Sequence, residues 1–320
     1  MSASGGTKAI IAAMLANLGI AIAKFIAWIV SGSASMLAEA IHSLADTGNQ
    51  ILLLLGGRLS KRRADADHPF GYGRERYVYA FLVSIILFTV GGLFSINHGI
   101  EKLQHPHALE NVWVPVTVLL ISIVLESFSL RTAIRESNHV RGKDQSWVSF
   151  VRHAKAPELP VVLLEDIAAL IGLVFALLGV TLTAITGNSV YDAVGTLLIG
   201  SLLVVVAVVL GIETKSLLVG EGATMADHDR ILAALEDGPQ VEKVIHMKTL
   251  YLGPDELLVA AKLGFASDRP LGEVAHDIDV IEARVRDAVP IARVIYLEPD
   301  ILRTSGPAPL TEEIVVRSSD

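Results

Sequence analysis

Two residues with metal-binding side chains, His42 and Asp46, lie four positions apart in an otherwise largely apolar stretch from about Met36 to Leu59. A spacing of four places both side chains on one face of a helix. An imidazole nitrogen and a carboxylate oxygen together suit a borderline divalent cation such as Zn²⁺. Ionisable groups inside an apolar helix are costly and usually functional. The pair therefore predicts a metal site within a membrane.

Two further polar residues extend this pair into a stripe. Glu39, His42, Asp46 and Asn49 follow one another at helical spacing, whereas the other faces carry Leu, Ala and Ile. Such a stripe cannot face lipid, so we expect it to face a protein interior or a water-filled path. A hydrogen-bond network that joins helices is the structural alternative. Four polar residues in register, including a metal-type pair, favour a functional site.

A second pair of carboxylates, Glu165 and Asp166, interrupts another apolar run, from Val161 to Gly172. Adjacent residues on a helix point about 100° apart, so only one of them should face the stripe directly. We expect Asp166 to be the metal ligand. Glu165 would then be an accessory ligand, a proton carrier or the partner of a basic residue.

The composition is that of an integral membrane protein. Hydrophobic residues make up 52% of the 320, and the mean hydropathy is +0.54. Segments of about 20 apolar residues can span a bilayer, and the chain has six of them. The first lacks a strongly basic leader and an A-x-A cleavage site, so we interpret it as a helix rather than a signal peptide. The predicted spans are Ala9 to Val30, Met36 to Leu59, Tyr77 to Gly99, Val112 to Ala133, Pro160 to Ile185 and Val190 to Ile212.

Basic residues predict the orientation of these spans, because cytoplasmic loops carry an excess of Lys and Arg. The loops on the opposite side hold only Lys102, and both termini are therefore predicted to be cytoplasmic. The Ala-, Gly- and Val-rich composition suits a bacterial inner (plasma) membrane. The basic residues of the cytoplasmic loops are Arg58, Lys61, Arg62, Arg63, Arg74, Arg76, Arg131, Arg135, Arg141, Lys143, Arg152 and Lys155.

Charge and cysteine content exclude some functions. The net charge is −8, mainly from the region after Ile212, which argues against binding to nucleic acid. The chain has no Cys, so neither disulfides nor thiolate metal sites can form. Any metal site must use His, Asp, Glu and Asn.

The region after Leu218 has the pattern of a small α+β domain. It predicts a helix over Met225 to Glu236, strands over Lys243 to Leu252 and Glu256 to Phe265, a helix over Leu271 to Val289 and a strand over Ala292 to Glu298. This αββαβ order is ferredoxin-like and places helices on one face of a sheet. We therefore expect a transmembrane domain over 1–212, a cytoplasmic domain over 213–300 and a disordered tail over 301–320.

At this point the residues resemble a known family, the cation diffusion facilitators. The matching runs are Gly32 to Gln50, GSASMLAEAIHSLADTGNQ, and His68 to Arg76, HPFGYGRER. The resemblance covers about Lys8 to Asp300, and the adjacent Glu and Asp look like the zinc-transporter-nine-like branch. It implies a homodimeric metal/proton antiporter with six helices and a cytoplasmic αββαβ domain.

The resemblance also implies which residues bind metal. Members take two ligands from the second span, here His42 and Asp46, and two from the fifth, here the region of Glu165 and Asp166. Members usually space the fifth-span ligands four apart, whereas Val162 and Leu170 occupy those positions around Asp166. The fourth ligand therefore stays open, and Asn49, Asn17 or water are the candidates. Glu39 is a possible accessory residue.

Two accessory metal sites of the family are only partly matched. After the second span, Asp65 and His68 match two ligands, but Tyr72 stands where a second His is common. A phenol is a poor zinc ligand at neutral pH, so we interpret this loop as mainly structural. In the soluble domain, His246, His276 and Glu298 match, but Tyr296 replaces a usual His.

The predicted function is secondary active efflux of a divalent cation in exchange for protons. Metal binding needs neutral imidazole and ionised carboxylates, so metal and protons compete; a free imidazole titrates near pH 6.5. Mixed nitrogen and oxygen ligands favour Zn²⁺, with Cd²⁺, Co²⁺, Ni²⁺, Fe²⁺ and Mn²⁺ as other candidates. The partners are thus a metal ion, protons and the lipid bilayer.

An enzyme and a sensor are the two alternatives to a transporter. An intramembrane hydrolase would need a motif such as H-E-x-x-H or Gly-x-Gly-Asp, and the sequence contains neither, so we do not expect an enzyme. A metal-responsive membrane sensor or scaffold, without net transport, is the alternative that stays open. Ion flux distinguishes it from a carrier.

Overall fold

The chain folds into two compact units. A computed structural model describes residues 3–106, 109, 111–142 and 145–302, and side chains from residue 17 onward. The first unit comprises Met1–Arg62 and Glu75–Ser216, and the second comprises Arg63–Arg74 and Leu217–Asp320. The loop after the second helix thus belongs to the second unit.

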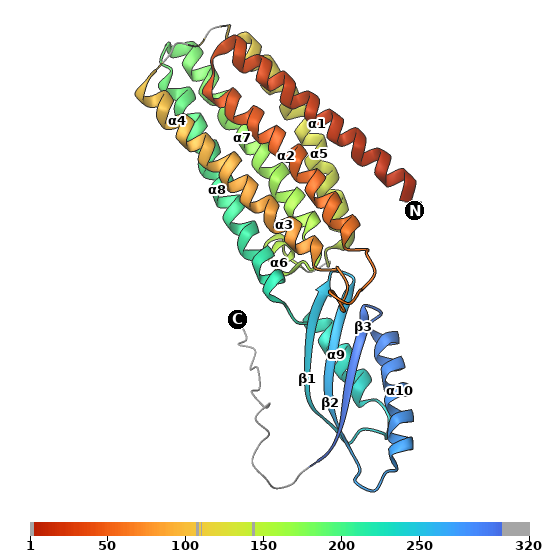
Figure 1. Cartoon of the computed structure of the whole chain (residues 1–320). Coiled ribbons are helices and arrows are strands. Elements are labelled where there is room, and N and C mark those ends of the chain that lie inside the picture. The colour runs from red at the N-terminus through yellow and green to blue at the C-terminus, as the bar shows by residue number, and fades with distance from the viewer. Residues whose placement is uncertain (1–2, 107–108, 110, 143–144, 303–320) are drawn as a thin grey trace. The chain divides into compact units, whose positions relative to one another are not determined.

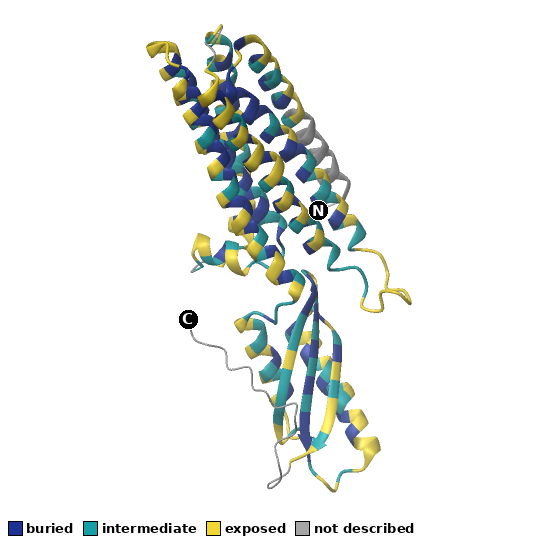
Figure 2. Cartoon of the chain, turned by 60° about the vertical axis from the view of Figure 1, so that its left-hand side comes forward, coloured by how far each residue is buried: buried dark blue, intermediate teal, exposed yellow. Residues whose placement is uncertain are grey.

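The first unit is a bundle of long helices that run side by side (Figure 1). Buried positions alternate with exposed ones along the helices, as expected when one face of each helix packs on its neighbours (Figure 2). In chain order its elements are α1 (Ala3–Ser31), α2 (Ala34–Leu59), α3 (Glu75–Ile86), the π-helix η1 (Leu87–Leu93), α4 (Phe94–Gln104), α5 (Trp113–Val140), α6 (Trp147–His153), α7 (Glu158–Thr186) and α8 (Val190–Val219).

Within the described part of the chain, four helical segments are long and apolar enough to cross a membrane. They are Glu75–Gln104, Trp113–Val140, Glu158–Thr186 and Val190–Val219, and Asn17–Ser31 is a shorter apolar helix. The protein is therefore an integral membrane protein. Helix α2 has a comparable length, but its polar stripe lowers its hydropathy below that of the four segments.

The third predicted span differs from a continuous α-helix. A π-helical turn, η1, interrupts it between α3 and α4. Gly91 and Gly92 lie in this turn, and a Cβ atom at Gly92 would lie 2.6 Å from the side chain of Val204 on α8. The absence of side chains at these glycines lets the widened turn approach α8 closely.

A carboxylate from a distant helix holds the start of α2. Asp192, in the first turn of α8, accepts hydrogen bonds from Ser33 Oγ at 2.7 Å, from the Ala34 amide at 2.6 Å and from the Ser35 amide at 3.3 Å. These donors belong to the first turn of α2, where amides lack partners within the helix and where negative charge is favoured. Asp192 therefore anchors α2 to α8 and has a structural role.

The second unit contains a three-stranded sheet with two helices. Its elements are α9 (Met225–Glu236), β1 (Lys243–Gly253), β2 (Glu256–Phe265), α10 (Leu271–Ala288) and β3 (Ala292–Ile301). The strand order is β1-β2-β3, with β1 antiparallel and β3 parallel to β2. The predicted αββαβ order is confirmed. The sequence predicts the tail over 301–320, but β3 continues to Ile301, and residues 303–320 of that tail lie outside the described residues.

Candidate metal centre

The polar stripe of α2 lies inside the helical unit. Glu39, His42, Asp46 and Asn49 are 0%, 1%, 9% and 0% exposed. Residues three and four apart on a helix share a face, and this face of α2 packs against α1 and α7. The stripe is thus enclosed by protein, as its polarity requires.

His42 and Asp46 form a pair with unused lone pairs. His42 Nδ1 lies 3.4 Å from Asp46 Oδ1. Both ring nitrogens of His42 and Oδ1 of Asp46 are buried without a hydrogen-bond partner. Buried polar atoms almost always have hydrogen-bond partners, and exceptions point to a bound water or ion or to a functional role. The pair therefore offers nitrogen and oxygen donors to a ligand.

The two carboxylates of α7 point toward different helices. Asn49 Nδ2 on α2 donates a hydrogen bond of 2.7 Å to Glu165 Oε1, whereas Ser129 Oγ on α5 donates one of 2.9 Å to Asp166 Oδ2. Glu165 is buried, and Asp166 is partly exposed. We expected Asp166 to face the stripe, but the rotation of α7 turns Glu165 toward α2 instead. The angle of about 100° between neighbours leaves Asp166 facing α5.

Two charged residues near the stripe were missed by the sequence analysis. Lys24 on α1 is 0% exposed, and its Nζ donates to Glu39 Oε2 at 3.0 Å and to Ser43 Oγ at 2.7 Å. Glu126 on α5 is 7% exposed and interacts electrostatically with Lys24. Both are ionisable residues within apolar segments, and this signal was available in the sequence.

Carboxylates outnumber basic groups around the stripe. Asp46 interacts electrostatically with Glu165, Glu126 and Asp166, and with the single ammonium of Lys24. Within the described ranges, however, no three His, Asp or Glu side chains come close enough together to hold one ion. The candidate ligands are therefore gathered in one region without enclosing a common point.

Asn17 is the remaining residue proposed for this region. Asn17 on α1 is half-buried. Nothing in the described contacts joins it to His42 or Asp46, and its role as a ligand stays a prediction.

The loop after α2 satisfies its own polar groups. Asp65 accepts hydrogen bonds from the His68 amide at 2.8 Å and from the Tyr72 hydroxyl at 2.6 Å. The Tyr72 hydroxyl is the main cause of a lowered pKa at Asp65, and the His68 amide adds to it. The rings of His68 and Tyr72 are 4.4 Å apart at their centroids. Both oxygens of Asp65 accept hydrogen bonds from residues of the loop. This geometry agrees with the interpretation of the loop as mainly structural.

The metal-ligand candidates of the soluble domain do not all lie free in one place: Glu298 is in an ion pair, and His276 lies on a helix. His246 on β1 and Glu298 on β3 both pair in register with Lys262 of the central strand. Lys262 Nζ lies 3.1 Å from Glu298 Oε1 and 3.1 Å from Asp300 Oδ2, and these acids raise the pKa of Lys262, Asp300 foremost. His276 is exposed on α10. An ammonium thus holds the carboxylate that a metal would need.

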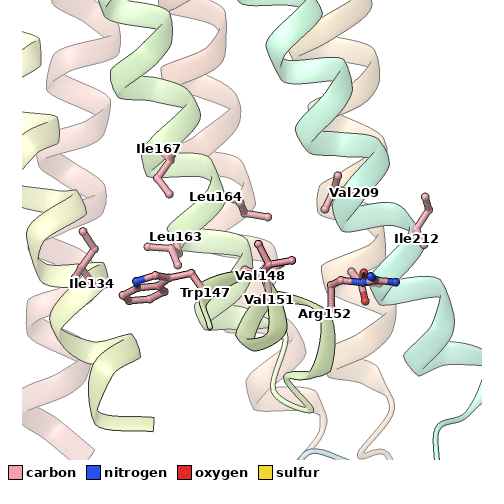
Figure 3. Close-up of a pocket in the computed structure, with 11 residues that line it drawn as sticks. Ile134, Trp147, Val148, Val151, Arg152, Leu163, Leu164, Ile167, Val209 and Ile212 are labelled. Atoms are coloured by element: carbon pink, nitrogen blue, oxygen red, sulfur yellow. Dashed lines mark ion pairs between the residues drawn. The ribbon is translucent and has the colours of Figure 1, made fainter. Parts of the chain in front are cut away.

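A separate apolar pocket of about 750 Å³ opens between α5, α6, α7 and α8 (Figure 3). Leu163, Leu164 and Ile167 of α7 line it, and Arg152 and Glu213 pair across it at 3.7 Å. Its lining offers no free cation ligand, so it is not the metal centre. Helix α7 therefore has an apolar face on this pocket and directs Glu165 toward α2.

The chain matches one protein-family model and several known proteins. Residues 10–219 match the model of the cation efflux transmembrane domain. The chain is 35% identical over 262 residues to the proton-coupled zinc antiporter SLC30A9, mitochondrial, of Homo sapiens, covering 82% of this chain and 46% of that protein. It is 29% identical over 259 residues to metal tolerance protein C4 of Arabidopsis thaliana, covering 81% and 57%.

A bacterial relative is matched over nearly its whole length. The cation-efflux pump FieF of Pectobacterium atrosepticum is 24% identical over 293 residues, covering 90% of this chain and 91% of that protein. By contrast, the chain spans about half the length of the SLC30A9 proteins that it matches.

Proposed function

The chain belongs to the cation efflux family, and from this premise we propose that it moves a divalent transition-metal cation, with Zn²⁺ as the principal ion, across a membrane in exchange for protons. It is a transporter and not an enzyme. The names of its relatives, proton-coupled zinc antiporters and a cation-efflux pump, support the proposal.

One observation carries the proposal: His42 and Asp46 are buried and have unsatisfied donor atoms in a carboxylate-rich interior. Removing a charged carboxylate from water without a partner is costly. The cluster must therefore be neutralised, either by protons or by a cation. These two alternatives are the two loaded states of an antiporter.

The exchange follows from the ligand chemistry. His42 can coordinate an ion only as a neutral imidazole, and a carboxylate of Asp46 or Glu165 only when ionised. Binding of the cation thus releases protons, and protonation releases the cation. To join the ion, Glu165 would give up its hydrogen bond from Asn49, and Asp166 would give up that from Ser129.

The donor types support Zn²⁺ as the ion. One imidazole and two or three carboxylates form a mixed set that suits Zn²⁺, whereas oxygen donors alone would favour Mn²⁺. Cd²⁺, Co²⁺, Ni²⁺ and Fe²⁺ accept similar ligands.

We further propose six membrane spans, the four apolar segments together with α1 and α2, and both termini in the cytoplasm. Helix α2 spans despite its polar stripe because the stripe is covered by α1 and α7. The positive loop residues support this orientation. A bacterial inner membrane and a homodimer complete the proposal. Alternating access would come from movement of helices around the site, as in other secondary transporters.

Flux in proteoliposomes tests the proposal. Purified protein is reconstituted with a zinc-sensitive dye and a pH-sensitive dye inside the vesicles, and Zn²⁺ is added under an imposed pH gradient. We expect Zn²⁺ and protons to move in opposite directions, and Asp46→Asn to abolish both movements. Zn²⁺ binding without any flux would overturn the transporter and favour the sensor.

A further inference from the structure

Lys24 is a buried cation next to the candidate metal centre that the exchange mechanism does not use. It is 0% exposed, as is its partner Glu39. Its ammonium has two acceptors, Glu39 Oε2 at 3.0 Å and Ser43 Oγ at 2.7 Å. Ser43 is the neighbour of His42 in the chain, and Glu39 lies one turn away from His42 on the same face. The ammonium thus binds α2 on both sides of His42.

Glu39 is within reach of the space between α2 and α7. Its second oxygen, Oε1, is buried without a hydrogen-bond partner. A Cβ atom at Gly172 on α7 would lie 2.7 Å from this oxygen, so the carboxylate extends to the α7 backbone. On the other side of the pair, Asn49 contacts Glu165. His42 and Asp46 therefore lie between two contacts that join α2 to α7, and Glu39 forms one of them.

The ion pair decides whether Glu39 can serve as a ligand. A carboxylate held by an ammonium is neutralised, and its oxygens are attracted less strongly to a second cation. Without Lys24, Glu39 would be an uncompensated buried carboxylate one turn from His42, and a divalent ion would be its nearest source of positive charge. The metal would then gain an oxygen ligand.

We propose that Lys24 determines ion specificity by holding Glu39 in an ion pair and thereby keeping this carboxylate out of the coordination shell of the transported cation. The shell then keeps a large share of imidazole nitrogen and few oxygens. Such a shell favours Zn²⁺, which prefers low coordination numbers, over Mn²⁺, which prefers more oxygen ligands. The proposal rests on the proposed cation transport and assigns the choice of ion to a residue that does not touch it.

Glu126 is a second carboxylate near Lys24, but it does not take the place of Glu39 as the direct partner of the ammonium. Glu126 on α5 interacts electrostatically with both Lys24 and Glu39, but the two direct contacts of the ammonium lie on α2. Removing Lys24 would leave Glu39 and Glu126 facing one another without a cation. Two uncompensated carboxylates would then attract a cation that prefers oxygen ligands to the space next to Glu39.

The ratio of Zn²⁺ flux to Mn²⁺ flux in proteoliposomes tests the proposal with four proteins: wild type, Lys24→Met, Glu39→Gln and the double variant. We expect Lys24→Met to lower the Zn²⁺/Mn²⁺ ratio by about tenfold or more, the scale of a lost specificity contact. The double variant removes both charges and should return the ratio to that of wild type. Glu39→Gln alone should leave the ratio high, because the competing ligand is gone.

The outcomes separate the two proposals. A wild type that moves neither ion overturns the transport function, and the proposal for Lys24 with it. A wild type that moves Zn²⁺ while Lys24→Met keeps the same ratio overturns only the role of Lys24. An equally low ratio in Lys24→Met and the double variant would also overturn it, since Glu39 would then not be the competing ligand.

A merely structural role predicts a different result, a fall in both fluxes at a constant ratio. Size-exclusion profiles in detergent verify folding. If Lys24→Met does not fold, Lys24→Gln carries the same test, because its amide can still donate to Glu39 and Ser43 without the positive charge. The double variant Lys24→Gln, Glu39→Gln should then have the Zn²⁺/Mn²⁺ flux ratio of wild type.

Discussion

Asn49 on α2 donates a hydrogen bond of 2.7 Å to Glu165 on α7. This contact joins the two helices that carry the candidate ligands, and it identifies Glu165, rather than Asp166, as the carboxylate directed toward the polar stripe. Asp166 accepts instead from Ser129 on α5.

The first prediction separates the two carboxylates of α7. Glu165→Gln should lower Zn²⁺ flux by about 10- to 100-fold, the scale on which metal sites respond to lost contacts, and Asp166→Asn should lower it less. Each substitution preserves size and removes only the charge. Initial rates at several Zn²⁺ concentrations measure the difference. A larger loss of Zn²⁺ flux in Asp166→Asn than in Glu165→Gln would show that the ion binds the carboxylate that faces α5.

Glu126 provides a second prediction. Because it adds negative charge near Asp46, Glu126→Gln should raise the Zn²⁺ concentration for half-maximal flux by a few-fold, on the order of 1 kcal/mol. Glu136, exposed on the same helix, supplies the matched control, and Glu136→Gln should behave as wild type. Equal effects of the two substitutions would exclude a specific role for Glu126.

The third prediction concerns stability. Asp192→Ala leaves the Ser33 hydroxyl and the Ala34 and Ser35 amides without their acceptor. Loss of a helix cap costs about 0.5 to 2 kcal/mol, and burial of the site places the cost at the upper end. The unfolding midpoint in detergent should fall, while the Zn²⁺/Mn²⁺ flux ratio of the folded protein stays constant. A changed ratio with an unchanged midpoint would contradict the structural role.

A fourth prediction concerns the pKa of Asp65, whose ordinary value is 3.8 and which the Tyr72 hydroxyl and His68 amide lower. Tyr72→Phe should raise this pKa toward 3.8, measured from the carboxyl carbon by NMR. Because the folded value lies below the unfolded one, the stabilisation is present above about pH 4 and disappears as the pH falls through the folded value. An unchanged pKa would mean that the hydrogen bond does not form in solution.

Much of the architecture followed from the sequence alone. Periodicity located α9, β1, β2 and α10 almost to the residue, because each alternates or repeats its apolar positions against one core. The spacing of Glu39, His42, Asp46 and Asn49 placed them on one buried face, because an α-helix has a fixed period. Runs of apolar residues predicted the four apolar segments that the described part of the structure contains, and the span predicted over α2 stays a proposal because its polar stripe lowers its hydropathy.

Tertiary structure decided the rest, because it depends on the rotation and pairing of helices that are distant in the chain. No local pattern distinguishes Glu165 from Asp166; only the packing of α7 between α2 and α5 assigns each carboxylate to a partner. Lys24 and Glu39 are fifteen positions apart, and their ion pair arises from the contact between α1 and α2. The sequence thus determined which residue types line the interior, and the fold determined which of their charges remain available to a cation.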